Sequence, residues 1–326
     1  MKIAILDDYQ DAVRTLDCYR MLDDHELTIW NDHVEDVELL AQRLADTEVL
    51  VLIRERSSIG EALLARLPRL KLISQHGVTP HIDLAACTRH GVIVSAGQYG
   101  RPSYATAEFT WGLIIGAMRH IPQEVARLKA GHWQSTLGDV LHGRTLGIFG
   151  YGRIGALIAN YGKAFGMEVM VWGRETTLDK ARADGYRIAA SKRELFERSD
   201  VLSLHLRLTD ATRGIVSAQD LAAMKSSALI VNTSRAGLIE AGALESALRA
   251  GRPGKAAIDV YEHEPLQGAD HALLALNNAL CTPHLGYVER DAYEFGFGKV
   301  FEQVLAYAGG APVQVVNPEV LAQSGT

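Results

Sequence analysis

Leu146-Gly-Ile-Phe149 runs directly into Gly150-Tyr-Gly-Arg-Ile-Gly155, so that an apolar, strand-like segment is followed by a GxGxxG turn. In such a turn the first glycine permits a tight reversal, the second lets a pyrophosphate approach the backbone, and the third lets a helix pack on the strand. The anion lies at the amino end of that helix, where free N–H groups and the helix dipole favour negative charge. This stretch predicts a dinucleotide site whose cofactor-binding residues are Gly150, Gly152, Arg153, Ile154 and Gly155.

The surroundings of the glycines separate this interpretation from an incidental turn. The chain has 30 glycines in 326 residues, so a bare match to the motif is weak evidence. Apolar residues recur at helical spacing over residues 154–165, and residues 168–172 are typical of the next strand. Strand, glycine turn, helix and second strand follow one another in the order that a dinucleotide-binding βαβ unit requires.

The end of the second strand bears on which dinucleotide is bound. An acid usually stands there, about 20 residues after the glycines, and binds the ribose hydroxyls. This chain has Gly173-Arg174 instead, which leaves room for a 2′-phosphate and offers it a planar, permanently charged partner. NADP is therefore the favoured cofactor. NAD is the alternative, because Glu175 could take the ribose role or simply pair with Arg174 at the surface.

The alternation of β-branched runs with amphipathic stretches predicts α/β architecture with parallel sheets. In the first block, strands are expected at residues 3–6, 49–53, 70–74 and 92–94. A long helical segment, 103–118, follows, and Pro122 then interrupts or restarts the helix. A second α/β series begins at Leu146, and the chain closes with a helical stretch at 290–307. We expect two domains with a boundary near residue 100.

Composition and charge exclude several kinds of partner. The formal net charge is −6, which offers no basic surface to nucleic acid or an anionic membrane. No apolar run approaches the roughly 18 residues that span a bilayer, and the first residues enter a strand rather than a secretory signal. Three widely spaced cysteines predict neither a disulfide framework nor a metal site. We expect a cytoplasmic protein without nucleic-acid, membrane or metal binding.

Three polar segments in the last third of the chain each follow an apolar, strand-like run. They are Asn232-Thr-Ser-Arg235-Ala-Gly237, Asp259-Val-Tyr-Glu-His-Glu264-Pro265 and Thr282-Pro-His284-Leu-Gly286, and the strands are expected at 228–231, 255–258 and 279–281. In open α/β sheets, ligands bind at the carboxyl ends of the strands. A fixed cation, a carboxylate and an imidazole are thus expected at one sheet edge, where together they can bind an acid and move a proton.

Taken together, these residues resemble the D-isomer-specific 2-hydroxyacid dehydrogenases, a family that includes glyoxylate and hydroxypyruvate reductases and phosphoglycerate dehydrogenase. The resemblance extends from the opening strand to Val315-Val-Asn-Pro-Glu-Val320, with the glycine motif, arginine, glutamate and histidine in the family's order. It implies two Rossmann-like or flavodoxin-like domains, the nucleotide-binding domain being inserted into the substrate domain. Residues 1–99 and 290–326 would form the substrate (catalytic) domain, and residues 100–289 the dinucleotide-binding domain.

The resemblance also implies a reaction, in which a hydride passes between NAD(P)H and a small 2-keto acid, or in reverse from a D-2-hydroxy acid. Arg235 would bind the substrate carboxylate, His284 would be the acid/base, and Glu264 would pair with His284. The chemistry of these side chains agrees, since a proton must reach the keto oxygen and an imidazolium held by a carboxylate is a suitable donor near neutral pH. A guanidinium fork both binds a carboxylate and steadies charge on the oxygen.

Further contacts follow from the same resemblance. Backbone N–H groups around Gly77, Val78 and Thr79 would bind the remaining carboxylate oxygen, although the family usually has a second glycine where this chain has Thr79. Arg207 stands where the family usually has proline, and could face a phosphorylated ribose or be an ordinary exposed arginine. Cofactor contacts are implied for Thr106, His205, Thr233, Ser234 and Asp259, beside those expected of Gly173 and Arg174.

Several matters stay open at the level of sequence. The same fold serves corepressor-like interaction proteins that sense a dinucleotide, and turnover of a keto acid is what distinguishes an enzyme from such a sensor. The family implies a homodimer, in which residues 131–143 commonly reach to the partner. Arg54 and Arg56 are candidates for binding a substrate's distal group, or else are solvated surface charges. The identity of the 2-hydroxy acid and the physiological direction are not given by these residues.

Overall fold

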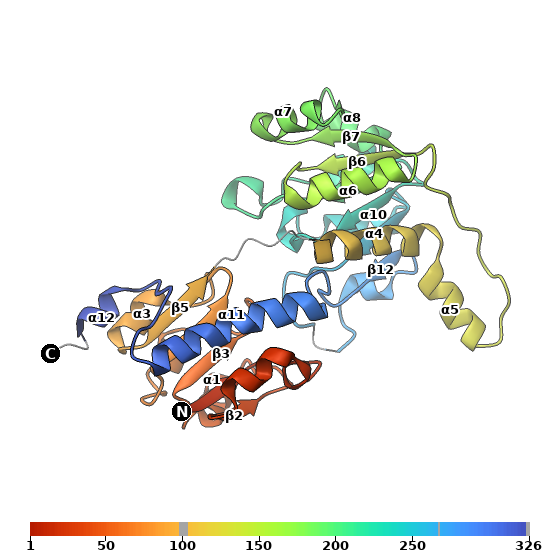
Figure 1. Cartoon of the computed structure of the whole chain (residues 1–326). Coiled ribbons are helices and arrows are strands. Elements are labelled where there is room, and N and C mark those ends of the chain that lie inside the picture. The colour runs from red at the N-terminus through yellow and green to blue at the C-terminus, as the bar shows by residue number, and fades with distance from the viewer. Residues whose placement is uncertain (98–103, 267, 324–326) are drawn as a thin grey trace. The chain divides into compact units, whose positions relative to one another are not determined.

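The structure is a computed structural model in which residues 1–97, 104–266 and 268–323 are described. The chain divides into two compact units: Met1–Arg101 with Glu289–Thr326, called here the terminal unit, and Pro102–Val288, called the central unit. Each unit is built on one parallel β-sheet flanked by helices (Figure 1). This confirms the expected two-domain α/β fold with one unit inserted in the other. The boundary expected near residue 100 lies outside the described residues.

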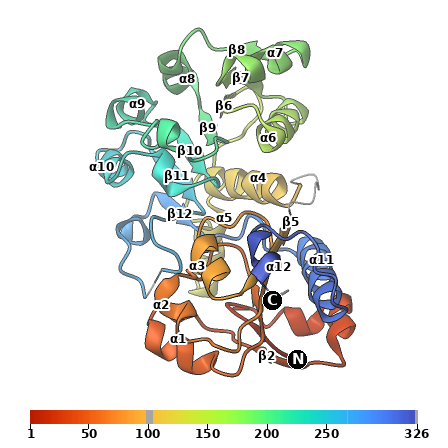
Figure 2. The same cartoon turned by 90° about the vertical axis from the view of Figure 1, so that its left-hand side faces the viewer.

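The terminal unit contains a five-stranded sheet in the order β2-β1-β3-β4-β5, which is a flavodoxin-like strand order. Its strands are β1 (Lys2–Ile5), β2 (Glu26–Ile29), β3 (Val49–Leu52), β4 (Leu72–His76) and β5 (Ile93–Gly97). Its helices are α1 (Val37–Arg43), α2 (Glu61–Leu64), α3 (Leu84–Arg89), α11 (Arg290–Ala308) and α12 (Glu319–Gln323). Helices α1 to α3 cover one face of this sheet and α11 covers the other (Figure 2).

The segment after α11 pairs with the outer edge of this sheet. The Val316 N–H donates to the Val94 carbonyl at 2.9 Å, and the Ala96 N–H donates to the Gln314 carbonyl at 3.0 Å. The buried side chain of Asn317 accepts the Val94 N–H at 2.9 Å and donates to the Val92 carbonyl at 2.9 Å. An uncovered edge strand would expose a row of unpaired backbone groups. The short segment after α11 therefore covers the open edge of the sheet formed by β1 to β5.

The central unit contains a seven-stranded sheet in the order β12-β11-β10-β9-β6-β7-β8. Its strands are β6 (Thr145–Phe149), β7 (Glu168–Trp172), β8 (Arg187–Ile188), β9 (Val201–Leu204), β10 (Leu229–Asn232), β11 (Lys255–Ile258) and β12 (Ala279–Cys281). Its helices are α4 (Tyr104–Met118), α5 (Ile121–Lys129), α6 (Arg153–Ala164), α7 (Glu175–Ala183), α8 (Lys192–Arg198), α9 (Ala218–Ala223) and α10 (Ala243–Arg249). Counted from β6, this is the Rossmann order 3-2-1-4-5-6 with one further strand.

Helices cover both faces of the central sheet. Alternate residues of each strand point to opposite sides and therefore pack into different cores. Leu146 and Ile148 of β6 pack with the core formed by α4 and α6, whereas Phe149 packs with the core formed by α8, α9 and α10. The Phe149 ring meets the Phe196 ring edge to face at a centroid distance of 6.2 Å. With both faces covered, only the strand ends are left to bind a ligand.

The long helical stretch expected at 103–118 is α4, although residue 103 is not described. Pro122 restarts the helix rather than interrupting it: α5 begins at Ile121, after His120 adopts a left-handed φ of 52°. A proline in a first helical turn loses no hydrogen bond, since N–H groups there have no partner within the helix. Among the described helices, none has the length and apolarity needed to cross a membrane.

Candidate functional site

The glycine turn after β6 lies where the strand order of the central sheet reverses. Gly150 has a φ of +100°, and a Cβ atom there would lie 2.7 Å from the His205 carbonyl oxygen. A Cβ atom on Gly155 would lie 2.2 Å from the Gly150 carbonyl oxygen. By contrast, a Cβ built on Gly152, directly before α6, would have no heavy atom of the described residues within 4 Å apart from Gly152 itself and its chain neighbours. Open backbone at a helix amino end fits a dinucleotide diphosphate at this switch point.

Gly173 and Arg174 lie at the end of β7, beside this turn. A Cβ atom built on Gly173 would lie 3.6 Å from the Gly150 Cα atom. Arg174 is exposed at the amino end of α7, and its guanidinium has no ion pair or hydrogen bond within the described part of the chain. Glu175 pairs with Arg182 at 2.8 Å. The suggestion that Glu175 pairs with Arg174 is therefore wrong, because a helical neighbour binds the carboxylate.

A chain of hydroxyl groups connects α4 to the end of β10. The Thr110 hydroxyl donates to the Thr106 carbonyl at 2.6 Å and lies 2.7 Å from the Thr233 hydroxyl. Since the single proton of Thr110 is used toward Thr106, Thr233 must donate to Thr110. Thr106 and Thr233 were expected from the sequence as cofactor contacts, but Thr110 was not. A hydroxyl on the apolar face of α4 is the signal that could have identified Thr110, since a buried hydroxyl requires a partner.

His205, at the end of β9, is a fixed neutral group. Its Nε2 atom lies 2.9 Å from the Ser203 hydroxyl, and its Nδ1 atom is buried without a partner among the described residues. Burial lowers the pKa of His205 to about 3. The imidazole is therefore uncharged at neutral pH, and it meets the cofactor turn through its backbone carbonyl rather than through a titrating ring.

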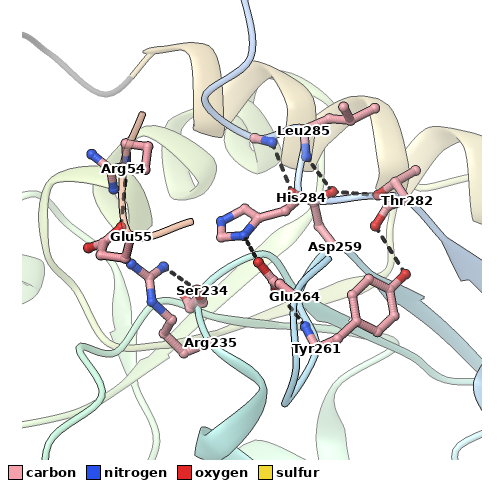
Figure 3. A network of polar contacts seen from close by, with 11 residues as sticks. Arg54, Glu55, Ser234, Arg235, Asp259, Tyr261, Glu264, Thr282, His284 and Leu285 are labelled. Atoms are coloured by element: carbon pink, nitrogen blue, oxygen red, sulfur yellow. Dashed lines mark hydrogen bonds and ion pairs between the residues drawn. The ribbon is translucent and has the colours of Figure 1, made fainter. Parts of the chain in front are cut away.

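Arg235 extends from a turn that closes on the end of β10. The buried Asn232 side chain accepts the Ser234 N–H at 3.0 Å and donates to the Arg235 carbonyl at 2.9 Å. The Ser234 hydroxyl donates to the Leu204 carbonyl of β9 at 2.7 Å. The Arg235 guanidinium in turn donates to the Ser234 carbonyl at 2.7 Å (Figure 3). Two neighbouring strands thus fix the backbone that carries this cation.

His284 and Glu264 point toward one another and are hydrogen-bonded through Nδ1 and Oε2 (Figure 3). The other carboxylate oxygen accepts the Tyr261 N–H at 2.8 Å. Burial works against ionisation of Glu264, but the hydrogen bond and charge of His284, the Tyr261 N–H and the charge of Arg235 outweigh it, so the pKa of Glu264 is below its ordinary value. The Tyr287 ring stands edge-on to the imidazole at a centroid distance of 5.3 Å.

The turn that carries His284 is held by the buried carboxylate of Asp259. Its Oδ1 atom accepts the Thr282 hydroxyl at 2.6 Å and the Leu285 N–H at 2.8 Å, and its Oδ2 atom accepts the Gly286 N–H at 2.9 Å. Burial nevertheless raises the pKa of Asp259 against these donors. Only one lone pair of Oδ2 is left for the carboxamide contact expected of Asp259. Its observed contacts are to the turn, in which His284 has a left-handed φ of 52°.

Gly77, Val78 and Thr79, whose backbone N–H groups were expected to bind a carboxylate oxygen, lie in the loop after β4. The Gly77 N–H already donates to the Gly97 carbonyl at 3.0 Å, which takes it out of the expected anion-binding set. The N–H groups of Val78 and Thr79 have no acceptor within the described residues. The fully buried side chain of Gln75 donates to the Val78 carbonyl and fixes this loop.

The two arginines after β3 differ in their surroundings. Arg56 donates to the Asp7 carbonyl and lies over the Tyr9 ring, 4.5 Å from its centroid. It is therefore held in place and is not a freely solvated charge. Arg54 has a left-handed φ of 58°, and a Cβ atom on Gly77 would lie 3.5 Å from its Nη1 atom. An arginine held beside a loop with free N–H groups forms an anion-attracting surface within the terminal unit.

A Rossmann sheet with a glycine turn at its switch point, joined to a flavodoxin-like unit, defines a two-domain dinucleotide-binding α/β protein. Residues 111–286 match the sequence model of the family described as D-isomer specific 2-hydroxyacid dehydrogenase, NAD binding domain. The chain belongs to the D-isomer specific 2-hydroxyacid dehydrogenase family, as its sequence suggested.

Individual relatives support this membership. The glyoxylate reductase of Aeropyrum pernix is 36% identical over 91% of this chain and 91% of its own length. The D-3-phosphoglycerate dehydrogenase of Methanocaldococcus jannaschii is 37% identical over 82% of this chain, which matches 51%, about half, of that longer protein. The crystal structure of a phosphoglycerate oxidoreductase from Vibrio cholerae O395 is 53% identical, with a TM-score of 0.91 over 95% of this chain and 100% of that one.

The lowered pKa of Glu264 predicts a pH-dependent contribution to stability. The ionised carboxylate stabilises the folded state above the ordinary pKa of 4.5, and this contribution is lost as pH falls through the lower folded-state value. Glu264→Gln should therefore lower the Tm at pH 6, and the difference from the unaltered protein should shrink toward pH 4. Calorimetry across this range is the measurement. Glu262→Gln, at an exposed neighbouring position, is the control, and a difference that stays constant with pH would contradict the assignment.

Proposed function

We propose that this protein reduces a small 2-keto acid with a nicotinamide dinucleotide and, in reverse, oxidises the corresponding D-2-hydroxy acid. The family membership supports a nicotinamide dinucleotide cofactor, and the name of the Aeropyrum pernix relative records reduction of a 2-keto acid, glyoxylate. The observation that carries the proposal is the pairing of His284 with Glu264 through Nδ1. That pairing leaves the Nε2 atom of the imidazole to exchange a proton with a substrate oxygen.

In the proposed reaction each side chain has a defined role. When bound, the reduced nicotinamide supplies a hydride to the keto carbon. His284 donates a proton from Nε2 to the keto oxygen, while the ionised Glu264 stabilises the imidazolium from the other side. Arg235 binds the substrate carboxylate with its guanidinium fork and offsets negative charge on the oxygen as the hydride arrives. Asp259 keeps the turn of His284 in place.

The substrate's distal group is a separate question. The relatives' names include glyoxylate and 3-phosphoglycerate. Glyoxylate has no distal group, whereas 3-phosphoglycerate carries a distal phosphate. The N–H groups of Val78 and Thr79 are candidates for the substrate carboxylate, and Arg54 and Arg56 for a distal anion. NADPH and NADH oxidation across a panel of 2-keto acids of varied size and charge would identify the substrate class.

Removal of the imidazole tests the reaction directly. His284→Ala should lower kcat by about 10²-fold to 10⁴-fold, because general acid catalysis is lost, while the Kd for the dinucleotide stays within about twofold. Steady-state kinetics and calorimetric titration of the cofactor give the two values. His263→Ala, which removes an exposed histidine from the segment that holds Glu264, is the matched control and should keep full turnover. Normal turnover by His284→Ala would refute the proposed acid/base.

We favour NADP over NAD because of the surroundings of Arg174. Its guanidinium is exposed next to Gly173 and is not engaged by Glu175, which pairs with Arg182 instead. A phosphate on the ribose would find a planar cation there without having to displace a carboxylate. Glu175 could still accept ribose hydroxyls by leaving Arg182, so NAD is the alternative.

Arg174→Ala should raise the KM for NADPH by about tenfold or more and leave the KM for NADH within about twofold, since a charged hydrogen bond contributes about 1.5–3 kcal/mol. Initial rates with both cofactors measure the effect. Arg193→Ala removes an exposed arginine from α8, away from Arg174 and Glu175, and is the control. Equal changes in the two KM values would remove the basis for preferring NADP.

We also propose a homodimer formed by α5 and the segment that follows it. Within the described residues α5 has no buried side chain, and Glu124 on this helix binds the Ser135 N–H at 3.0 Å and the Thr136 hydroxyl at 2.8 Å. This holds an extended segment beside the helix. The large apolar side chains exposed here are Ile121, Val125, Leu128, Trp133, Leu137 and Val140. An apolar surface of this kind is typical of an interface with another protein copy.

Leu137, which is 95% exposed, provides the test of this surface. Leu137→Asp should shift the molar mass measured by light scattering from two chains to one, because burying a carboxylate in an apolar interface is costly. Leu39→Asp places the same charge at an exposed leucine on α1 and should leave the mass at two chains. A single-chain mass for the unaltered protein would refute the proposed dimer.

The alternative is a dinucleotide-sensing, corepressor-like interaction protein with the same fold. Such a protein needs the glycine turn but not an imidazole paired with a carboxylate beside a fixed arginine. Binding of NADPH or NADH without reduction of any keto acid in the panel would favour this alternative. The His284–Glu264 pair favours the enzyme.

A further inference from the structure

We propose that Tyr261 is a positioning residue, an inference that rests on the proposed function. Its backbone N–H holds Glu264 and its phenol holds the turn that carries His284, so that the carboxylate and the imidazole stay aligned. Tyr261 follows Asp259 and Val260 after the end of β11, in the segment that also contains Glu264, and it is 8% exposed. Its contacts reach both members of the pair from one rigid side chain and its own backbone. Nothing in the motif spacing pointed to this residue.

The first contact fixes the carboxylate. The Tyr261 N–H donates to Oε1 of Glu264 at 2.8 Å, and Oε2 of the same carboxylate faces His284. Both oxygens are thereby engaged, one by the backbone and one by the imidazole. The carboxylate plane is set by the position of the Tyr261 backbone.

The second contact fixes the turn of the imidazole. The Tyr261 hydroxyl donates to the Thr282 carbonyl at 3.0 Å (Figure 3). The same carbonyl accepts the N–H of His284 at 3.1 Å. One carbonyl oxygen therefore joins the phenol of Tyr261 to the backbone of His284, where φ is 52°. A left-handed conformation at a residue other than glycine is strained and persists only when its surroundings enforce it.

The phenol and Asp259 come from the same segment after β11 but bind different groups of the turn. Asp259 binds this turn through the Thr282 hydroxyl and the N–H groups of Leu285 and Gly286, whereas Tyr261 binds it through a carbonyl. Asp259 thus satisfies donors and Tyr261 satisfies an acceptor of the same turn. Removing the phenolic hydroxyl leaves the Asp259 contacts intact, so the turn would persist but with one restraint fewer.

The state and packing of Tyr261 suit a permanent donor. Burial, with the nearby Cys281 thiol next in effect, raises the pKa of Tyr261 far above neutral, so the hydroxyl keeps its proton. The ring packs edge-on against His271 at a centroid distance of 5.0 Å and an interplanar angle of 72°. A phenylalanine would keep this packing and lose the hydrogen bond to the Thr282 carbonyl together with the hydroxyl's contact to the Cys281 thiol. Tyr261→Phe is therefore a selective change.

The expected effect is on the chemical step. Tyr261→Phe should lower kcat about tenfold, since small displacements of catalytic groups are expensive in rate, while the KM for the keto acid and the Kd for the dinucleotide stay within about twofold. The same substitution in a Glu264→Gln background should lower kcat by less than about twofold. Tyr261 then acts through the carboxylate–imidazole pair, and the two losses are not additive.

Tyr186→Phe is the matched control. Tyr186 is also buried in the central unit, and its hydroxyl donates to Asn160 at 2.6 Å, among residues that contact neither Glu264 nor His284. This variant loses one buried hydrogen bond, as Tyr261→Phe does, and should keep kcat in both backgrounds. A fall in kcat shared by the two tyrosine variants would show a general loss of stability and would overturn the proposal.

A second measurement does not depend on turnover. The proton between His284 Nδ1 and Glu264 should give a downfield NMR resonance that is absent in His284→Ala. Tyr261→Phe should shift this resonance upfield or speed its exchange with water, and Tyr186→Phe should leave it unchanged. If the unaltered protein reduces no keto acid, the proposed function fails, and the resonance alone then decides on the positioning role. An unchanged resonance, or equal losses of kcat in both backgrounds, would overturn the inference on Tyr261.

Discussion

The close approach of β6 to β9 is the constraint on which the central unit depends. At the end of β6 the backbone passes so near the His205 carbonyl that any side chain at Gly150 would collide with it. Strand order reverses at this point, so the connections leave toward opposite faces and open the space beyond Gly152. The same contact places His205 in the interior, where desolvation keeps it neutral. One steric requirement thus accounts for the glycine motif, the cofactor space and the state of a buried histidine.

The surroundings of the ionisable groups at the carboxyl ends of the central strands shift their pKa values in different directions. Burial dominates at His205 and Asp259, lowering the pKa of the first and raising that of the second. At Glu264 the partners dominate, and the carboxylate is held ionised next to His284. Two carboxyl groups five residues apart in sequence therefore have different tasks: Asp259 binds backbone donors of a turn, and Glu264 faces a titratable ring. Such divergence between neighbours is typical of functional sites.

Much of this arrangement follows from local sequence. The strands β7, β11 and β12 have the bounds expected from their apolar runs, and each of the three polar segments emerges where a strand ends. The strand β2 was not expected, because its residues alternate in exposure at a sheet edge and carry little apolar signal. Contacts such as Thr110 to Thr233, 123 residues apart, depend on packing that no local pattern encodes. The hydrogen bond from the Gly77 N–H to the Gly97 carbonyl of β5 could not be predicted from sequence for the same reason.

The terminal unit is assembled from both ends of the chain, and this has a consequence for synthesis on the ribosome. The hydroxyl of Ser74 in β4 binds the Val300 carbonyl and the Gln303 side chain of α11, which emerge only after the whole central unit has been made. Until then the sheet of β1 to β5 lacks the helix that covers one face and the segment that pairs with β5. A nascent chain halted before α11 would carry an apolar sheet face open to other chains, the condition under which intermediates aggregate. The order of translation therefore makes the whole inserted unit available before the surrounding unit can be completed.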